Sequence, residues 1–198
     1  MSEYQHVTCR IRGLCPQLMN NGRKANPMDE YAMAIKAILS TRKRGGVLTE
    51  DQALEVMHLE FIGALYVDDQ GRPCWPGENL ESMMLSAAKK QRRGDDCKIG
   101  LLVDGNWPVI YDGPKTAEAL WKDKRFRKIC MARNKGVPVT KCRPIFTQWE
   151  LEFVVSFDPD VLDASVIGAW ATIAGQRIGL SDWRPKFGRF EVVSVNGK

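Results

Sequence analysis

The fold is decided by residues 144–157, PIFTQWELEFVVSF, and by the chain that follows them. Apolar and polar side chains alternate along this stretch, with Ile145, Trp149, Leu151, Phe153 and Val155 opposite Phe146, Gln148, Glu150 and Glu152. A period of two residues is that of a β-strand with one buried face. We therefore expect a long strand from Pro144 to Phe157.

A helix and a last strand are predicted after this strand. Asp158-Pro159 is typical of a helix start, and Gly175 of a helix end. The apolar stripe between them has helical spacing and consists of Leu162, Val166, Ile167, Trp170 and Ile173. Residues 189–195 then form a final strand. A helix that follows one strand and precedes another supplies a split βαβ element.

The rest of the chain adds a first strand, several helices and a hairpin. Residues 4–12 alternate with Val7, Cys9 and Ile11 on one side, as in a half-buried strand. We expect a helix capped by Asn26 at 27–40 and a helix with a Thr49/Gln52 capping box at 49–64. Further helices are expected at 116–121 and from 77 into the basic stretch before Gly94. Short strands are expected at 98–103 and 108–111, and a hairpin of 127–133 with 137–142 around Asn134-Lys135-Gly136.

Strands at both ends with helices and hairpins between them indicate an α+β fold. We expect a single domain over residues 1–198, ferredoxin-like or RRM-like, with an antiparallel sheet, helices on one of its faces and a helical insertion at about 27–64. The other face of such a sheet, or the loops at its rim, can bind single-stranded nucleic acid.

Composition excludes several classes of protein. With 198 residues, 44% hydrophobic and 27% charged, the chain is typical of a globular protein, and no apolar run is long enough to cross a bilayer. The N-terminus lacks the features of a signal peptide, so we expect a cytoplasmic protein without membrane contact. Six cysteines without a CxxC pair and only two histidines, His6 and His58, indicate neither a metal site nor a cofactor.

The basic residues are clustered, although the net charge of +5 is modest. The clusters lie at residues 41–44, 89–93, 122–128 and 133–135. Each alone is typical of a solvated helix end. Taken together, they favour a nucleic-acid-binding surface.

Residues 178–190, IGLSDWRPKFGRF, combine glycines, cations and aromatic residues. Glycine lets a main chain approach a ligand closely, Arg and Lys donate to phosphates, and Trp offers a stacking face. The candidate nucleic-acid-binding residues are Arg177, Gly179, Trp183, Arg184, Lys186, Gly188 and Arg189, and Arg125, Arg127, Lys128, Arg133 and Lys135 would extend the same track. The structural alternative is a Gly/Pro-rich turn with Trp183 and Phe187 in the core.

Two separated segments resemble the RAMP superfamily, the ferredoxin-like proteins that form backbone subunits and processing enzymes of CRISPR effector complexes. Residues 71–80, GRPCWPGENL, resemble the family's G-x-P-x-I-P-G-S-S-L-K-G segment, with Glu78-Asn79 in place of Ser-Ser. Residues 179–190 resemble its C-terminal glycine-rich loop. Asp182-Trp183-Arg184-Pro185 also resembles a phrase in uncharacterised bacteriophage proteins, so we expect a phage-encoded relative.

The resemblance implies a non-catalytic protein that binds single-stranded DNA or RNA and assembles side by side along the strand as a homo-oligomer. One alternative is a protein-interaction role, such as a mimic or inhibitor of a host CRISPR effector subunit, with Trp75, Trp107 and Trp121 as interface anchors. A nuclease is the other alternative.

Acidic residues for a nuclease exist at Asp68-Asp69, Asp95-Asp96 and Asp104. Two-metal chemistry needs several carboxylates that converge in space, whereas these residues lie at glycine-containing turns, where Asp is common for backbone reasons. We therefore expect a binding protein rather than an enzyme, with no catalytic residue.

Overall fold

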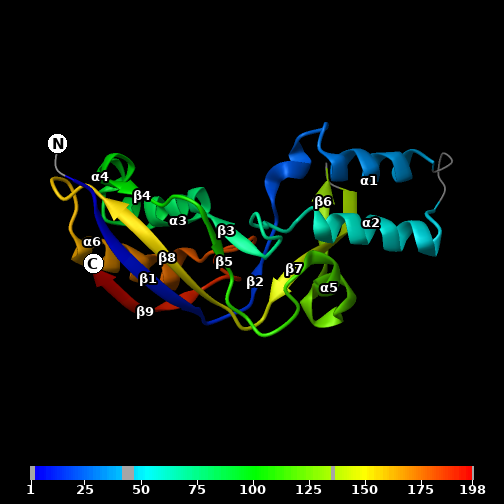
Figure 1. The fold of residues 1–198 in the computed structure, drawn as a ribbon. Helices are drawn as coiled ribbons and strands as arrows, with labels where there is room; N and C mark the ends of the chain where they lie inside the picture. Colours follow the sequence, from blue (N-terminus) through cyan, green and yellow to red (C-terminus); the bar gives the residue numbers. More distant parts are fainter. Residues whose placement is uncertain (1–2, 42–46, 135–136, 198) are drawn as a thin grey trace. The chain divides into compact units, whose positions relative to one another are not determined.

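The computed structural model describes residues 3–41, 47–134 and 137–197. The chain divides into two compact units. Unit 1 consists of residues 1–18, 67–113 and 146–198, and unit 2 of residues 19–66 and 114–145. Figure 1 shows the helices and strands of both units.

Unit 1 is built on a four-stranded antiparallel sheet. Its strands are β1 (Gln5–Gly13), β4 (Leu101–Leu102), β8 (Glu150–Phe157) and β9 (Phe190–Gly197), in the order β4-β8-β1-β9. In the chain, α3 (Gly77–Lys90) lies between β1 and β4, and α6 (Ala164–Ile173) lies between β8 and β9. This succession, β-α-β-β-α-β, is that of a ferredoxin-like fold. The predicted α+β class is confirmed.

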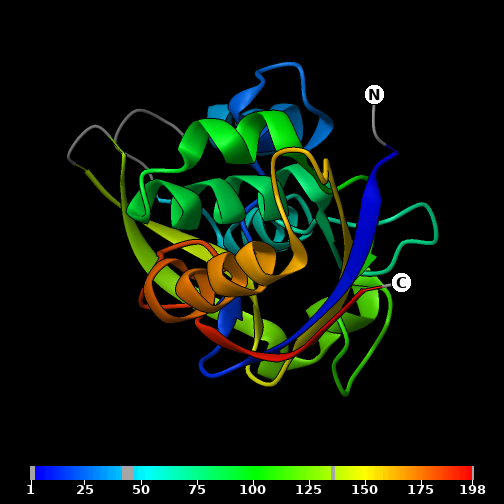
Figure 2. The same ribbon diagram turned by 90° about the vertical axis from the view of Figure 1, so that its left-hand side faces the viewer.

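The two faces of this sheet differ in chemistry. One face is buried and carries Val7, Cys9 and Ile11 of β1 with Leu151, Phe153 and Val155 of β8. On this side α6 packs against β9 and α3 (Figure 2). The outer face carries charged pairs, because Arg10 Nη2 and Arg12 Nε each lie 2.8 Å from a carboxylate oxygen of Glu150.

The strand predicted over residues 144–157 is interrupted. β7 (Val137–Phe146) ends at Phe146, and β8 begins at Glu150. Between them Trp149 is buried, and its indole Nε1 donates to the carbonyl oxygen of Cys15 at 3.0 Å. Phe146 is buried as well, so the predicted alternation does not run through the break.

Two further predictions for unit 1 are wrong. Residues 98–103 do not form one strand, because Gly94–Gly100 is the helix α4, which has Asp95 and Asp96 in its first turn. Acidic residues favour that end of a helix. The strand predicted at 108–111 is instead β5 (Asn106–Pro108), which pairs with β3 (Cys74–Pro76).

The last helix, α6, begins later than expected. Asp158 begins only a turn, in which its side chain accepts from the Asp160 amide at 2.9 Å. The helix starts after Asp163, whose carboxylate accepts from the amides of Ser165 and Val166 at 2.9 and 3.0 Å. A side-chain oxygen in this position satisfies amides that have no partner within the helix.

Unit 2 contains helices and a hairpin. Its elements are η1 (Gly22–Ala25), α1 (Glu30–Ser40), α2 (Glu50–Ile62), α5 (Ala117–Lys122), η2 (Lys124–Phe126), β6 (Arg127–Asn134) and most of β7. β6 and β7 pair from Arg127 opposite Pro144 to Asn134 opposite Val137, which confirms the predicted hairpin. α1 and α2 are the helices that we expected within residues 27–64.

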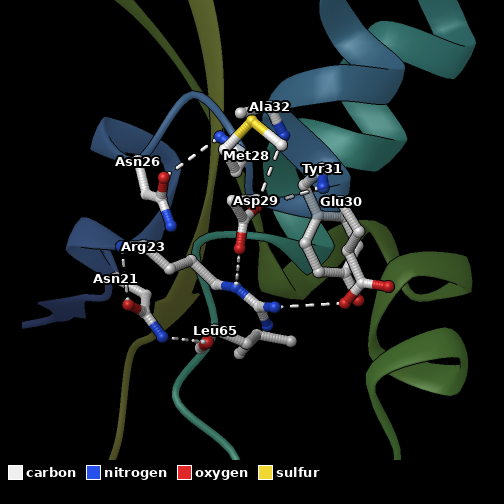
Figure 3. Close-up of polar contacts among 9 residues, drawn as sticks. All are labelled: Asn21, Arg23, Asn26, Met28, Asp29, Glu30, Tyr31, Ala32 and Leu65. Atoms are coloured by element: carbon white, nitrogen blue, oxygen red, sulfur yellow. Dashed lines mark hydrogen bonds and ion pairs between the residues drawn. The ribbon is translucent and has the colours of Figure 1, made fainter.

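The start of α1 is fixed by a local polar network (Figure 3). We expected Asn26 to cap this helix, but the cap is Asp29, which accepts from the amides of Tyr31 and Ala32 at 3.0 and 3.3 Å. Arg23 holds the same carboxylate through its Nε at 2.6 Å and reaches Glu30 at 3.1 Å. Asn26 caps the preceding turn instead.

Candidate functional site

The C-terminal loop, residues 179–189, connects α6 to β9. α6 continues as a π-helical turn, η3 (Ala174–Ile178), instead of ending at Gly175. It ends at Gly179, whose amide donates to the carbonyl oxygen of Ala174 at 2.7 Å. Leu180 N then donates to Gly188 O at 2.8 Å, which closes the loop at its base.

The C-terminal loop is also fixed to β2 (Gln17–Leu18) and the residue before it. Asp182 N donates to Leu18 O at 2.9 Å, and Leu18 N donates to the hydroxyl of Ser181 at 2.8 Å. Gly188 N donates to the carbonyl oxygen of Pro16 at 2.9 Å. The main chain at the base of the loop is therefore occupied by bonds within the protein.

The two predicted glycines serve this closure. Both are buried, with φ of 81° at Gly179 and 77° at Gly188. A β-carbon would lie 3.0 Å from Phe187 O at Gly179 and 2.3 Å from Leu180 O at Gly188. The close approach for which glycine is needed is thus between parts of the loop itself.

The side chains of the loop that the sequence predicted as ligands are exposed. Trp183 is 43% exposed, and Arg184, Lys186 and Arg189 are exposed. The structural alternative with Trp183 in the core is wrong, because Trp183 projects from the loop with a φ of 55°. Arg189 donates from Nε to the carbonyl oxygen of Pro185 at 3.0 Å and so also supports the loop.

A hollow of about 480 Å³, which we call the basic hollow, is lined by Arg177 of η3 and Arg184 of the C-terminal loop. Lys89 and Lys90 at the end of α3 line it too, and the other lining residues are Ser86, Ile178 and Pro185. None of the described residues lining the hollow is acidic. Two segments far apart in the sequence, the end of α3 and the stretch from η3 into the C-terminal loop, thus contribute four positive charges to one depression.

Lys89 and Lys90 were not among the predicted site residues. They belong to the cluster at residues 89–93, which has the composition of an ordinary solvated helix end. The packing of α3 near η3 gives these lysines their neighbours. Sequence spacing carries no signal for that contact.

The other predicted cations lie in unit 2. Arg125 pairs with Asp123 at 2.7 Å, and this hydrogen bond holds the pKa of Asp123 below its ordinary value. The guanidinium of Arg127 lies 4.5 Å from the ring centre of Trp121. Lys128 is exposed, and Arg133 lies in β6. Lys135 lies outside the described residues.

Three of the acidic residues considered for a nuclease make local contacts. Asp68 pairs with Arg72 at 2.7 Å, Asp96 pairs with Arg93 at 2.7 Å, and Asp104 accepts from the Gly105 amide at 2.8 Å. Within residues 3–41, 47–134 and 137–197, no three His, Cys, Asp or Glu side chains are grouped as a metal ion would need.

The tryptophans considered as interface anchors are covered to different degrees. Trp75 is 3% exposed and belongs to the core, opposite the half-buried Trp107 across β3 and β5. Trp121 is half-buried.

Five of the six cysteines are buried, and burial raises the pKa of Cys9 to about 12. Across the described residues, no helix has the length and apolar character needed to span a membrane.

Comparison with known proteins supports the resemblance at the level of the fold. No protein-family model matches the sequence, and no curated protein matches it. A chain in the cryo-EM structure of the type III-B Cmr-beta bound to cognate target RNA is similar with a TM-score of 0.55 and 10% identity. The match covers 98% of the present chain and 61% of the chain from the Cmr-beta structure. The present chain therefore spans less than two thirds of the length of that neighbour. The similarity shows that the two chains share a fold.

Proposed function

We propose that this protein binds single-stranded nucleic acid, without catalysing a reaction on it, through the basic hollow and the exposed side chains of the C-terminal loop. One observation carries the proposal: Lys89, Lys90, Arg177 and Arg184 line the same hollow, and no described acidic residue lines it. Four cations side by side repel one another unless an anion lies between them, and a phosphate backbone supplies such anions at regular spacing.

Trp183 adds a second kind of contact beside the cations. Its ring is partly exposed next to Arg184, on a loop whose main chain is fixed at its base and to β2. A base stacked on such a ring contributes roughly 1–3 kcal/mol. Stacking accepts every base, so binding through this contact and the phosphates tolerates sequence changes.

The fold similarity makes RNA the first polymer to test. The similar chain comes from a structure with cognate target RNA bound. The sequence of the present chain contains no signal that favours RNA over DNA. We further propose that copies assemble along the strand, as the RAMP resemblance implies, and that the protein is a phage-encoded relative of the CRISPR backbone subunits.

The proposal is tested by fluorescence anisotropy with labelled single-stranded RNA and DNA at two salt concentrations. We expect affinity to fall with salt and the double variant Arg177→Glu, Arg184→Glu to bind at least tenfold more weakly with a smaller salt dependence, since about 0.7 counterion is released per phosphate contact on single strands. The matched control is Lys36→Glu, which reverses an exposed charge on α1.

Equal loss in the control, or binding that ignores salt, would contradict the proposal. Failure to bind either polymer would favour the second candidate, a protein that takes the place of a subunit in a host CRISPR effector. The similarity over 98% of this chain supports that candidate. Co-purification with the subunits of such an effector is the measurement that checks it.

A further inference from the structure

A second, smaller hollow lies beside the basic hollow. It has a volume of about 190 Å³ and is lined by Trp75, Glu78, Asn79, Ser82, Leu180, Ser181 and Arg184. We call it the side hollow. Arg184 lines both hollows, so the two adjoin at this residue.

The two hollows follow one stripe of α3. Along this helix, Asn79, Ser82, Ser86 and Lys89 succeed one another at steps of three or four, and Glu78 and Lys90 adjoin the two ends of the stripe. Residues at this spacing share a helix face. The C-terminal loop forms the other wall, through Leu180 and Ser181 at the side hollow and Pro185 at the basic hollow. Together they make a groove between α3 and the loop.

The chemistry of the groove changes along its length. The basic hollow offers four cations, whereas the side hollow shares only Arg184 with it and adds the Glu78 carboxylate, the Asn79 amide and the hydroxyls of Ser82 and Ser181. Its buried apolar residues are Trp75 and Leu180. The accessible lining of the side hollow is more polar than apolar, so its hydrogen-bonding groups decide which ring it accepts.

The size of the side hollow limits what it can hold. Drug-sized ligands occupy pockets of about 300–1,000 Å³, and the side hollow, at about 190 Å³, is smaller. It suits a single flat ring. A nucleotide whose phosphate lies in the basic hollow would carry such a ring within reach of the neighbouring depression.

We propose that the side hollow receives one nucleobase of the bound strand and prefers a base with an exocyclic amino group over uracil or thymine. The inference rests on the proposed function. An ionised carboxylate such as Glu78 only accepts hydrogen bonds, and cytosine presents an amino group where uracil presents a carbonyl oxygen. A carboxylate facing that carbonyl oxygen is repelled, so Glu78 selects against uracil.

The test compares oligocytidylate and oligouridylate of twelve nucleotides, which differ on this edge of the base and are otherwise alike in size. Fluorescence anisotropy should show oligocytidylate bound at least about fivefold more tightly, as expected for one good contact to a base edge. Glu78→Gln should bring the two affinities within about twofold of each other, because the glutamine amide also donates.

Two more variants complete the design. Glu50→Gln changes an exposed glutamate in the first turn of α2 and should leave the preference unchanged. Ser82→Leu should fill the side hollow and lower oligocytidylate affinity to that of oligouridylate. Ser82 is exposed, so this variant retains the packed face of α3.

The outcomes separate the two proposals. Equal binding of both polymers by the unmodified protein, tighter binding of oligouridylate, or a preference that survives both Glu78→Gln and Ser82→Leu overturns the base pocket and leaves the nucleic-acid-binding function standing. Binding of neither polymer overturns both.

Discussion

Leu180 and Gly188 meet main chain to main chain. The Leu180 amide nitrogen lies 2.8 Å from the Gly188 carbonyl oxygen, and a β-carbon on Gly188 would stand 2.3 Å from the carbonyl oxygen of Leu180. The loop that carries Trp183 and Arg184 is thereby closed at its base, so its side chains project from a fixed main chain. A fixed main chain lowers the entropy lost when these side chains bind a ligand.

Gly188→Ala should therefore lower the free energy of unfolding. The new methyl group meets main-chain atoms, and the φ of 77° disfavours any L residue, so the combined cost is about 2–4 kcal/mol. Urea denaturation measures it. Gly105→Ala is the matched control, since Gly105 has a φ of 84° with nothing within 4 Å of an added β-carbon. Gly105→Ala should lower the free energy of unfolding by only about 1–2 kcal/mol. Equal losses for the two variants would contradict the close contact between Gly188 and the Leu180 carbonyl oxygen.

Trp183 has a main-chain conformation that favours glycine, with a φ of 55°. Trp183→Gly should consequently be more stable than Trp183→Ala by about 1 kcal/mol, the reverse of the usual order at exposed positions. Thermal and urea unfolding of the two variants provide the comparison. Both variants lose the ring, so both should bind single strands more weakly than the unmodified protein. A more stable alanine variant would show that the left-handed conformation is wrong.

Glu60 is a buried carboxylate with two lysine partners. It is 5% exposed, pairs with Lys24 at 3.3 Å and also with Lys141, and burial lowers the pKa of Lys24. Glu60→Gln leaves those cations without their counter-charge and should cost about 3–5 kcal/mol of unfolding free energy.

The control for this change is Glu30→Gln, because the side chain of Glu30 is 71% exposed in its pair with Arg23. A surface pair contributes about 0.2–1 kcal/mol. Chemical denaturation of both variants measures the two losses of unfolding free energy. Losses of similar size would mean that Glu60 is solvated.

Glu150 gives the outer face of the sheet a dependence on pH. Hydrogen bonds from Arg12, and then from Arg10, lower the pKa of Glu150 below its ordinary value of 4.5. A lowered pKa in the folded state means that the stabilisation is complete above pH 4.5 and is lost as the pH falls through the folded pKa.

The unmodified protein should exceed Glu150→Gln in unfolding free energy by about 1 kcal/mol at neutral pH, since the pairs are largely exposed. The difference should shrink below pH 4.5. Denaturation curves from pH 3 to 7 measure this. Glu152→Gln, on the same face of β8, is the control and should show a smaller difference, because Glu152 makes neither of these pairs. A difference that grows toward acid pH would refute the assigned pairing.

The amino-acid sequence predicted those elements whose signals are local. Thr49 and Gln52 predicted the capping box of α2, and Asn134 to Gly136 predicted the hairpin between β6 and β7. Local signals also misled where two of them competed. Asn26-Pro27 has the pattern of a helix start, yet Asp29 caps α1 because Arg23 fixes its carboxylate in place.

Period-two alternation and the composition of a loop are properties of neighbouring residues, so the α+β class and the exposed cations and tryptophan of the C-terminal loop could be predicted from the sequence. The tertiary structure alone decided that Lys89 and Lys90 join Arg177 and Arg184 around one hollow, and that Gly179 and Gly188 close the loop on itself. The physical reason is the same for both. Each relationship is a spatial contact that depends on how α3, η3 and the loop pack, and neither the period nor the composition of the sequence encodes that packing.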